Sequence, residues 1–160
     1  MDWVFINNRF IESTLTVAGA RYCSITDNRF SSAASTGTAI TVNDSRFGAS
    51  AETVIKNNRI SGFATAISMG GRSGGHNMSC LDNDCFGQAA LGIEVKSASN
   101  PPVRNVEVRG NQIAAYGTTA KSTWEGMTIN GTAWCVNNCV DASQGPRSAS
   151  IMVHPGSAGV

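Results

Sequence analysis

One six-residue motif returns along this chain and constrains the fold more than any other feature. It consists of an apolar residue, any residue, Asn, Asp or Gly, a residue that is usually Asn, any residue, and a second apolar residue. The copies span 5–10, 25–30, 55–60, 81–86, 108–113 and 135–140. Their last residues follow one another at steps of 20, 30, 26, 27 and 27. A repeat of this period is typical of a solenoid, in which each repeat forms one structural unit.

A second pattern, apolar–variable–apolar, follows each copy of the motif. It occupies 15–17, 40–42, 67–69, 93–95, 127–129 and 151–153. Alternation with a period of two indicates half-buried strands. Two strands in the same order in every period cannot form hairpins, so each strand should pair in parallel with its counterpart about 4.8 Å away.

These patterns predict an all-β chain, a parallel β-helix of about six coils that forms a single domain over residues 1–160. Alternation also predicts which residues face the interior. One inward column should contain residues 25, 55, 81, 108 and 135, and a second should contain 10, 30, 60, 86, 113 and 140.

The Asn residues of the motif have a physical role in this fold. A sharp bend between strands needs a residue at positive φ, where Asn, Asp and Gly are penalised least. Coils that stack should place Asn28, Asn58 and Asn111 above one another. Their amide groups can then form a hydrogen-bonded ladder that satisfies polar groups buried at the bend.

One additional copy, at 42–47, breaks the period. It is either a decorated turn within the long second coil or the beginning of a short coil of its own.

Composition excludes several classes of function. The net charge of +1 gives no basic field for nucleic acid, and no apolar run approaches the length of a membrane span. The five cysteines lack metal-ligand spacing, so we expect free thiols and neither a metal nor a cofactor. The first residues resemble the middle of a strand rather than a signal peptide, from which we expect the chain to begin inside a larger protein.

The repeat resembles that of the right-handed parallel β-helices of the pectate-lyase-like superfamily. The most typical stretch is 53–63 followed by 66–69, and the resemblance covers residues 4–153. The superfamily contains pectate lyases, polygalacturonases, polysaccharide epimerases and bacteriophage tailspikes. The Asn-Thr-Asp, Asp-Asp and Gly-His-Gly motifs of polygalacturonases are absent, as is the Arg-x-Pro-x-x-Arg motif of calcium-dependent pectate lyases.

The predicted register places charged residues together on the outer surface. Lys56 and Arg109 would flank Asp82 at one coil's distance, and Glu107 would lie in the adjacent column. Two carboxylates in unequal surroundings suit general acid and base roles, so Asp82 and Glu107 are the candidate catalytic residues. Lys56, Arg109 and, on the other sheet, Glu94 are the candidate substrate-binding residues. The alternative is an ordinary charged surface, which contributes little to stability.

A further outward column contains three arginines in successive coils. Its predicted members are Arg9, Arg29, Arg59, Cys85, Gln112 and Cys139. Like charges at coil spacing repel. The offsetting partner would be a carboxylate such as Glu12, Asp27 or Glu52, an adjacent subunit, an anionic polysaccharide, or simple hydration.

The resemblance implies three functional hypotheses. The leading one is a β-helix segment of a bacteriophage tailspike or tail fibre, a homotrimer in the virion tail that binds or depolymerises bacterial surface polysaccharide during host-cell attachment. The second is a non-catalytic structural or binding stalk of the same fold. The third is a bacterial polysaccharide lyase or epimerase.

Overall fold

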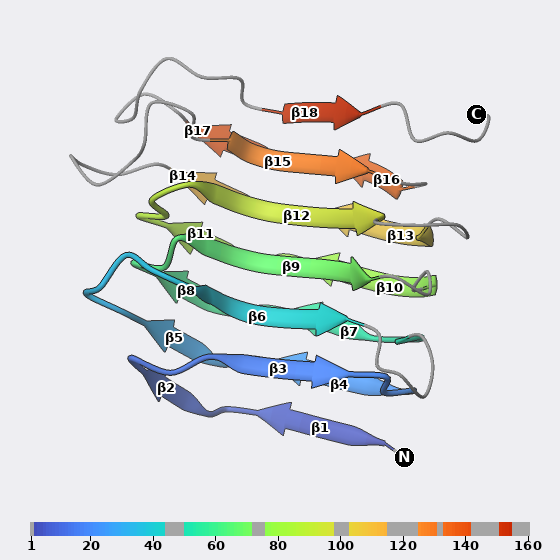
Figure 1. The fold of residues 1–160 in the computed structure, drawn as a ribbon, viewed down its shortest axis with the longest axis horizontal. Helices are drawn as coiled ribbons and strands as arrows, with labels where there is room; N and C mark the ends of the chain where they lie inside the picture. Colours follow the sequence, from blue (N-terminus) through green and yellow to red (C-terminus); the bar gives the residue numbers. More distant parts are fainter. Residues whose placement is uncertain are drawn as a thin grey trace.

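The computed structural model describes residues 2–43, 50–71, 76–97, 103–114, 125–130, 133–141 and 151–154. The described strands form three six-stranded parallel sheets, which we call sheets A, B and C (Figure 1). Sheet A contains β1 (Trp3–Ile6), β4 (Cys23–Thr26), β7 (Val54–Lys56), β10 (His76–Leu81), β13 (Arg104–Arg109) and β16 (Ala133–Val136). Sheet B contains β2 (Arg9–Ile11), β5 (Arg29–Ser31), β8 (Arg59–Ser61), β11 (Asp84–Phe86), β14 (Gln112–Ala114) and β17 (Cys139–Asp141). Sheet C contains β3 (Leu15–Ala18), β6 (Thr38–Asn43), β9 (Thr65–Gly71), β12 (Leu91–Ser97), β15 (Glu125–Asn130) and β18 (Ile151–His154).

Each coil contributes one strand to each sheet, and every strand before the last coil pairs with the strand three places further along the chain. The coils therefore stack from the N-terminal to the C-terminal end of the molecule (Figure 1). This arrangement confirms the predicted parallel β-helix. The prediction of two strands per coil was wrong, because the Asn bend divides the six-residue motif into two strands that belong to different sheets.

The second sequence pattern lies in sheet C in the predicted register. Leu15, Ile40, Ile67 and Ile93 follow one another across paired strands, and Met127 continues the column. These side chains are buried, because alternation turns every second residue of a strand towards the interior.

The two predicted inward columns of the motif are correct except in the fourth coil. Ile55 pairs with Cys80, and Ile60 pairs with Cys85. The first column is therefore Ile25, Ile55, Cys80, Val108 and Cys135, and the second is Phe10, Phe30, Ile60, Cys85, Ile113 and Val140. Leu81 and Phe86 were predicted to lie in these inward columns. Each instead follows the inward cysteine by one residue and points outward.

The fourth copy of the motif is 80–85 rather than 81–86, so cysteines occupy both of its apolar positions. Cys80 and Cys85 are fully buried and behave as small apolar residues. Burial raises the pKa of both thiols, and it raises the pKa of Cys23 to about 11. All five cysteines are free thiols, as the sequence predicted.

The predicted Asn ladder is present and runs through all six coils. Its members are Asn8, Asn28, Asn58, Asn83, Asn111 and Asn138. Both the backbone N–H and the side-chain amide of each of the first five Asn residues donate to Oδ1 of the Asn in the next coil, at 2.9–3.1 Å. The residue immediately before each ladder Asn has positive φ. These residues are Asn7, Asp27, Asn57, Asp82, Gly110 and Asn137.

The extra copy of the motif, at 42–47, begins at the end of β6, and only its first two residues lie in the described part of the chain. β6 ends at Asn43, and β7, the next strand in the chain, pairs with β4 of the coil before and β10 of the coil after. No coil is therefore inserted between β4 and β7, so the extra copy does not begin a coil of its own. Residues 44–49 lie outside the described part of the chain.

Candidate functional site

The outer face of sheet A carries most of the candidate residues. Alternation produces two outward columns on this face. The first contains Val4, Ser24, Val54, Ser79, Glu107 and Trp134. The second contains Ile6, Thr26, Lys56, Leu81, Arg109 and Val136. Charged and aromatic side chains gather in the fifth and sixth coils.

Glu107 and Arg109 form an ion pair on β13. Arg109 Nε donates to Glu107 Oε1 at 2.8 Å. The Arg109 side chain is 45% exposed and the Glu107 side chain is 41% exposed. They can meet because residues two apart on a strand point to the same face. The hydrogen bond to Glu107 and its negative charge raise the pKa of Arg109, and Asp82 adds a smaller contribution of the same sign.

Asp82 occupies a different position from the one predicted. Leu81, not Asp82, lies in register between Lys56 and Arg109. Asp82 is the positive-φ residue of the bend, and its N–H donates to the carbonyl of Arg109 at 2.9 Å. Its carboxylate lies over Gly110, where a Cβ would come within 2.2 Å of Asp82 Oδ1. Asp82 and Arg109 are therefore neighbours, but Lys56 is separated from Arg109 by an apolar side chain.

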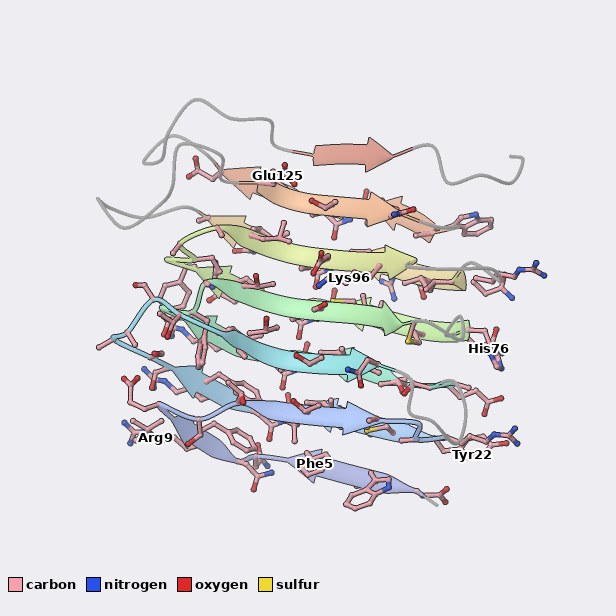
Figure 2. The ribbon with its side chains drawn as sticks, in the orientation of Figure 1. Phe5, Arg9, Tyr22, His76, Lys96 and Glu125 are labelled. Carbon is pink, nitrogen blue, oxygen red and sulfur yellow. The ribbon has the colours of Figure 1, made fainter. Side chains whose placement is uncertain are left out.

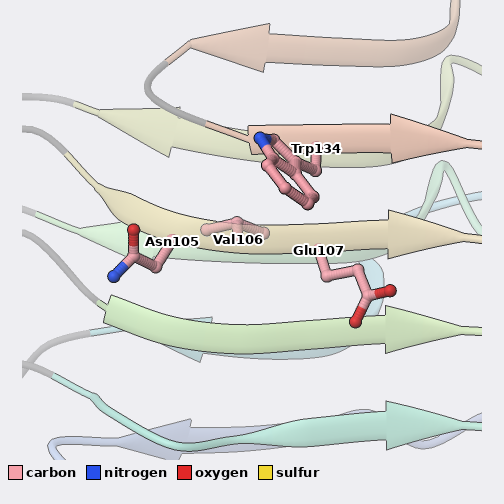
Figure 3. Close-up of a pocket in the computed structure, with 4 residues that line it drawn as sticks. All are labelled: Asn105, Val106, Glu107 and Trp134. Carbon is pink, nitrogen blue, oxygen red and sulfur yellow. The ribbon is translucent and has the colours of Figure 1, made fainter.

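Trp134 adds an aromatic surface that the sequence analysis did not identify. Its side chain is 77% exposed, and it lies one coil beyond Glu107 in direct register. A hollow of about 370 Å³ is lined by Trp134, Asn105, Val106 and Glu107 (Figure 3). The sequence alone could have identified Trp134 as an outward residue. Cys135 belongs to the column predicted to face inward, and alternation turns the residue before it outward.

Glu94 lies on another face of the molecule. It points outward from sheet C between Ser68 and Thr128, as predicted. Its carboxylate accepts a hydrogen bond from Ser68 Oγ at 3.1 Å and pairs with Lys96 Nζ at 2.8 Å. The structure therefore does not bring Glu94 together with Lys56 and Arg109.

Comparison with known proteins agrees with the coil architecture. Residues 1–159 match the family model of the right-handed beta helix region, so the chain belongs to this family and its coils are right-handed. No curated protein and no solved structure matches the chain significantly.

Two further findings concern the described residues. They contain no group of three or more His, Cys, Asp or Glu side chains placed to hold a metal ion. In the same part of the chain, no helix is long and apolar enough to cross a membrane.

Proposed function

We propose that this chain is the β-helix segment of a bacteriophage tailspike or tail fibre, and that it binds bacterial surface polysaccharide through the outer face of sheet A. The observation that carries the proposal is the hollow beside Trp134. It combines an exposed indole with the amide of Asn105 and the carboxylate of Glu107. A sugar presents an apolar face and a rim of hydroxyl groups, which suits an aromatic surface flanked by hydrogen-bonding groups.

The ion pair beside the hollow supports a binding role. Arg109 holds the Glu107 carboxylate in one orientation, at 2.8 Å, and so reduces the conformational entropy lost when a hydroxyl donates to it. A strand is also a rigid support for such a group. The parallel coils continue the same face along the molecule, which suits a linear polymer.

The geometry favours binding over cleavage. A general acid and a general base have to reach the same substrate bond. Glu107 is 41% exposed and hydrogen-bonded to a guanidinium group. Asp82 lies on the bend rather than in the Lys56–Arg109 column. Cleavage by these two carboxylates is the second proposal, because both lie beside Arg109.

Replacing Trp134 with alanine tests the binding site. We expect Trp134→Ala to weaken binding of the cognate surface polysaccharide by about tenfold or more, because a large exposed aromatic side chain usually dominates such a contact. Binding is measured by calorimetry with the polysaccharide selected from an array of bacterial capsular and O-antigen glycans. Tyr22→Ala is the matched control, since Tyr22 is also an exposed aromatic residue and does not line the hollow. Equal losses in the two variants would contradict the proposed site.

The catalytic alternative predicts a different result. If the segment depolymerises its polysaccharide, Asp82→Asn and Glu107→Gln should each lower turnover by about a hundredfold or more, as loss of a general acid or base does. The measurement is the size of the polysaccharide after incubation with each variant. If binding persists and both variants cleave like the unmodified protein, these carboxylates are not catalytic.

A further inference from the structure

The outer face of sheet B carries a row of exposed arginines. Arg9 pairs in register with Arg29, and Arg29 pairs with Arg59. All three side chains are exposed and separated by one coil, about 4.8 Å. Figure 2 shows Arg9 on the side of the molecule away from Tyr22 and His76. Like charges directly opposite one another in a sheet are destabilising, so a row of this kind is unfavourable unless something offsets the repulsion.

Only one member of the row is neutralised within the described part of the chain. The fourth position of the column is Asp84 and not Cys85 as predicted, because of the displaced register of the fourth coil. Asp84 Oδ2 lies 3.6 Å from Arg59 Nε, and the Arg59 guanidinium also lies 5.1 Å from the centre of the Phe86 ring. Arg9 and Arg29 form no side-chain hydrogen bond or ion pair with any described residue.

The carboxylates expected to offset the arginines do not do so. Both oxygens of Glu12 are occupied, by Ser32 Oγ and by the N–H of Ala33, each at 2.7 Å. The hydrogen bond from Ser32, followed by that from Ala33, lowers the pKa of Glu12. Asp27 and Glu52 lie on bends before sheet B and sheet A respectively, and neither forms an ion pair with the row.

We propose that Arg9, Arg29 and Arg59 form a binding site for an acidic polysaccharide that lies along the rod. Guanidinium groups bind carboxylates and sulfates through charge-assisted hydrogen bonds. In the neighbouring outward column, Ser31 and Ser61 lie between Ile11 and Phe86, and their hydroxyl groups can meet the uncharged part of each sugar beside Arg29 and Arg59. The coil spacing is close to the length of one sugar residue, so successive acidic sugars can meet successive arginines.

Single-stranded nucleic acid fits this face less well. Binding of nucleic acid normally uses aromatic side chains on which the bases stack. The three cationic coils present no outward aromatic residue in either column of sheet B, and Phe86 of the next coil is in contact with the Arg59 guanidinium. This second site does not depend on the sheet A hollow, and it lies on a different face.

The test compares two pairs of substitutions that remove the same charge. The double variant Arg9→Gln, Arg29→Gln removes the unpaired arginines of the row. The double variant Arg21→Gln, Arg104→Gln removes two exposed arginines elsewhere. We expect the unmodified protein to bind polygalacturonate, and the row variant to bind it about tenfold or more weakly, because charge-assisted hydrogen bonds are lost. The control pair should change the affinity by less than about twofold.

Further measurements distinguish binding at the arginine row from binding at the sheet A hollow and from nucleic-acid binding. The affinity should fall as salt is added, dextran should not bind through the row, and Trp134→Ala should leave polygalacturonate binding intact. The melting midpoint of the row variant should be unchanged or higher, because repulsion is relieved. The proposal is overturned if polygalacturonate does not bind, if both pairs lose affinity equally, if poly(dT) binds more tightly than polygalacturonate, or if Trp134→Ala abolishes binding.

Discussion

Replacing Asn58 with alanine is expected to lower the free energy of unfolding by about 3 kcal/mol or more, since several buried polar groups lose their partners at once. Asn58 is 1% exposed. Its Oδ1 accepts from the backbone and side-chain N–H groups of Asn28, and its amide donates to the carbonyl of Ile25 at 2.8 Å and to Asn83 Oδ1 at 3.0 Å. Solvent has almost no access to this position, so water cannot readily replace these hydrogen bonds.

The same substitution at the end of the ladder provides the control. Asn8 is exposed, and its amide donates to Asn28 Oδ1 and to the carbonyl of Ile6. Water can satisfy these groups after Asn8→Ala, so we expect a loss below about 1 kcal/mol. Urea denaturation of both variants gives the two values. If Asn58→Ala costs no more than Asn8→Ala, the ladder does not stabilise the interior of the coils.

Gly62→Ala is expected to be the second large destabilisation, about 3 kcal/mol or more, because a clash adds to backbone strain. Gly62 has φ of +74°, a conformation that disfavours every residue with a Cβ. A Cβ at this position would also lie 1.8 Å from the carbonyl oxygen of Ser32 in the preceding coil. That oxygen belongs to the backbone, so it can move only if the coil moves.

Gly87 separates the two contributions. It lies one coil beyond Gly62 and has a similar φ of +69°, but the nearest atom to its added Cβ would be 3.8 Å away. Gly87→Ala should therefore cost only the conformational strain, about 1–2 kcal/mol. Thermal melting or urea denaturation of the two variants provides the comparison. Equal losses would show that the contact with Ser32 relaxes at little cost.

The outward columns show where prediction from sequence was incomplete. The sequence analysis identified Arg9, Arg29 and Arg59 as a column, and the structure confirms this register. It assigned Cys85 to the next position, where the structure has Asp84. A displacement of one residue exchanges the two faces of a strand, so a single misassigned coil hid the partner of Arg59.

The candidate site depended on the same displacement. Glu107 and Arg109 were predicted to lie on one outward face, and they form an ion pair there. Lys56 and Arg109 were predicted to flank Asp82, but Leu81 lies between them. The sequence carried a signal for the correct register, because 80–85 also fits the motif and places Asn83 in the fourth position, as in the other copies.

The parallel coils, the bends and the Asn ladder could all be predicted from the amino-acid sequence. These features follow from local rules, because alternation assigns the two faces of a strand and only a few residue types accept positive φ. The tertiary structure decided that Cys80 and Cys85, rather than the larger Leu81 and Phe86, fill the core of the fourth coil. It also decided which side chains from different coils come together, such as Trp134 and Glu107 around one hollow and Arg59 with Asp84 in an ion pair. The physical reason is that the interior has to be filled and every ladder Asn has to meet the next one. Both conditions apply to the stacked coils together and to no single repeat.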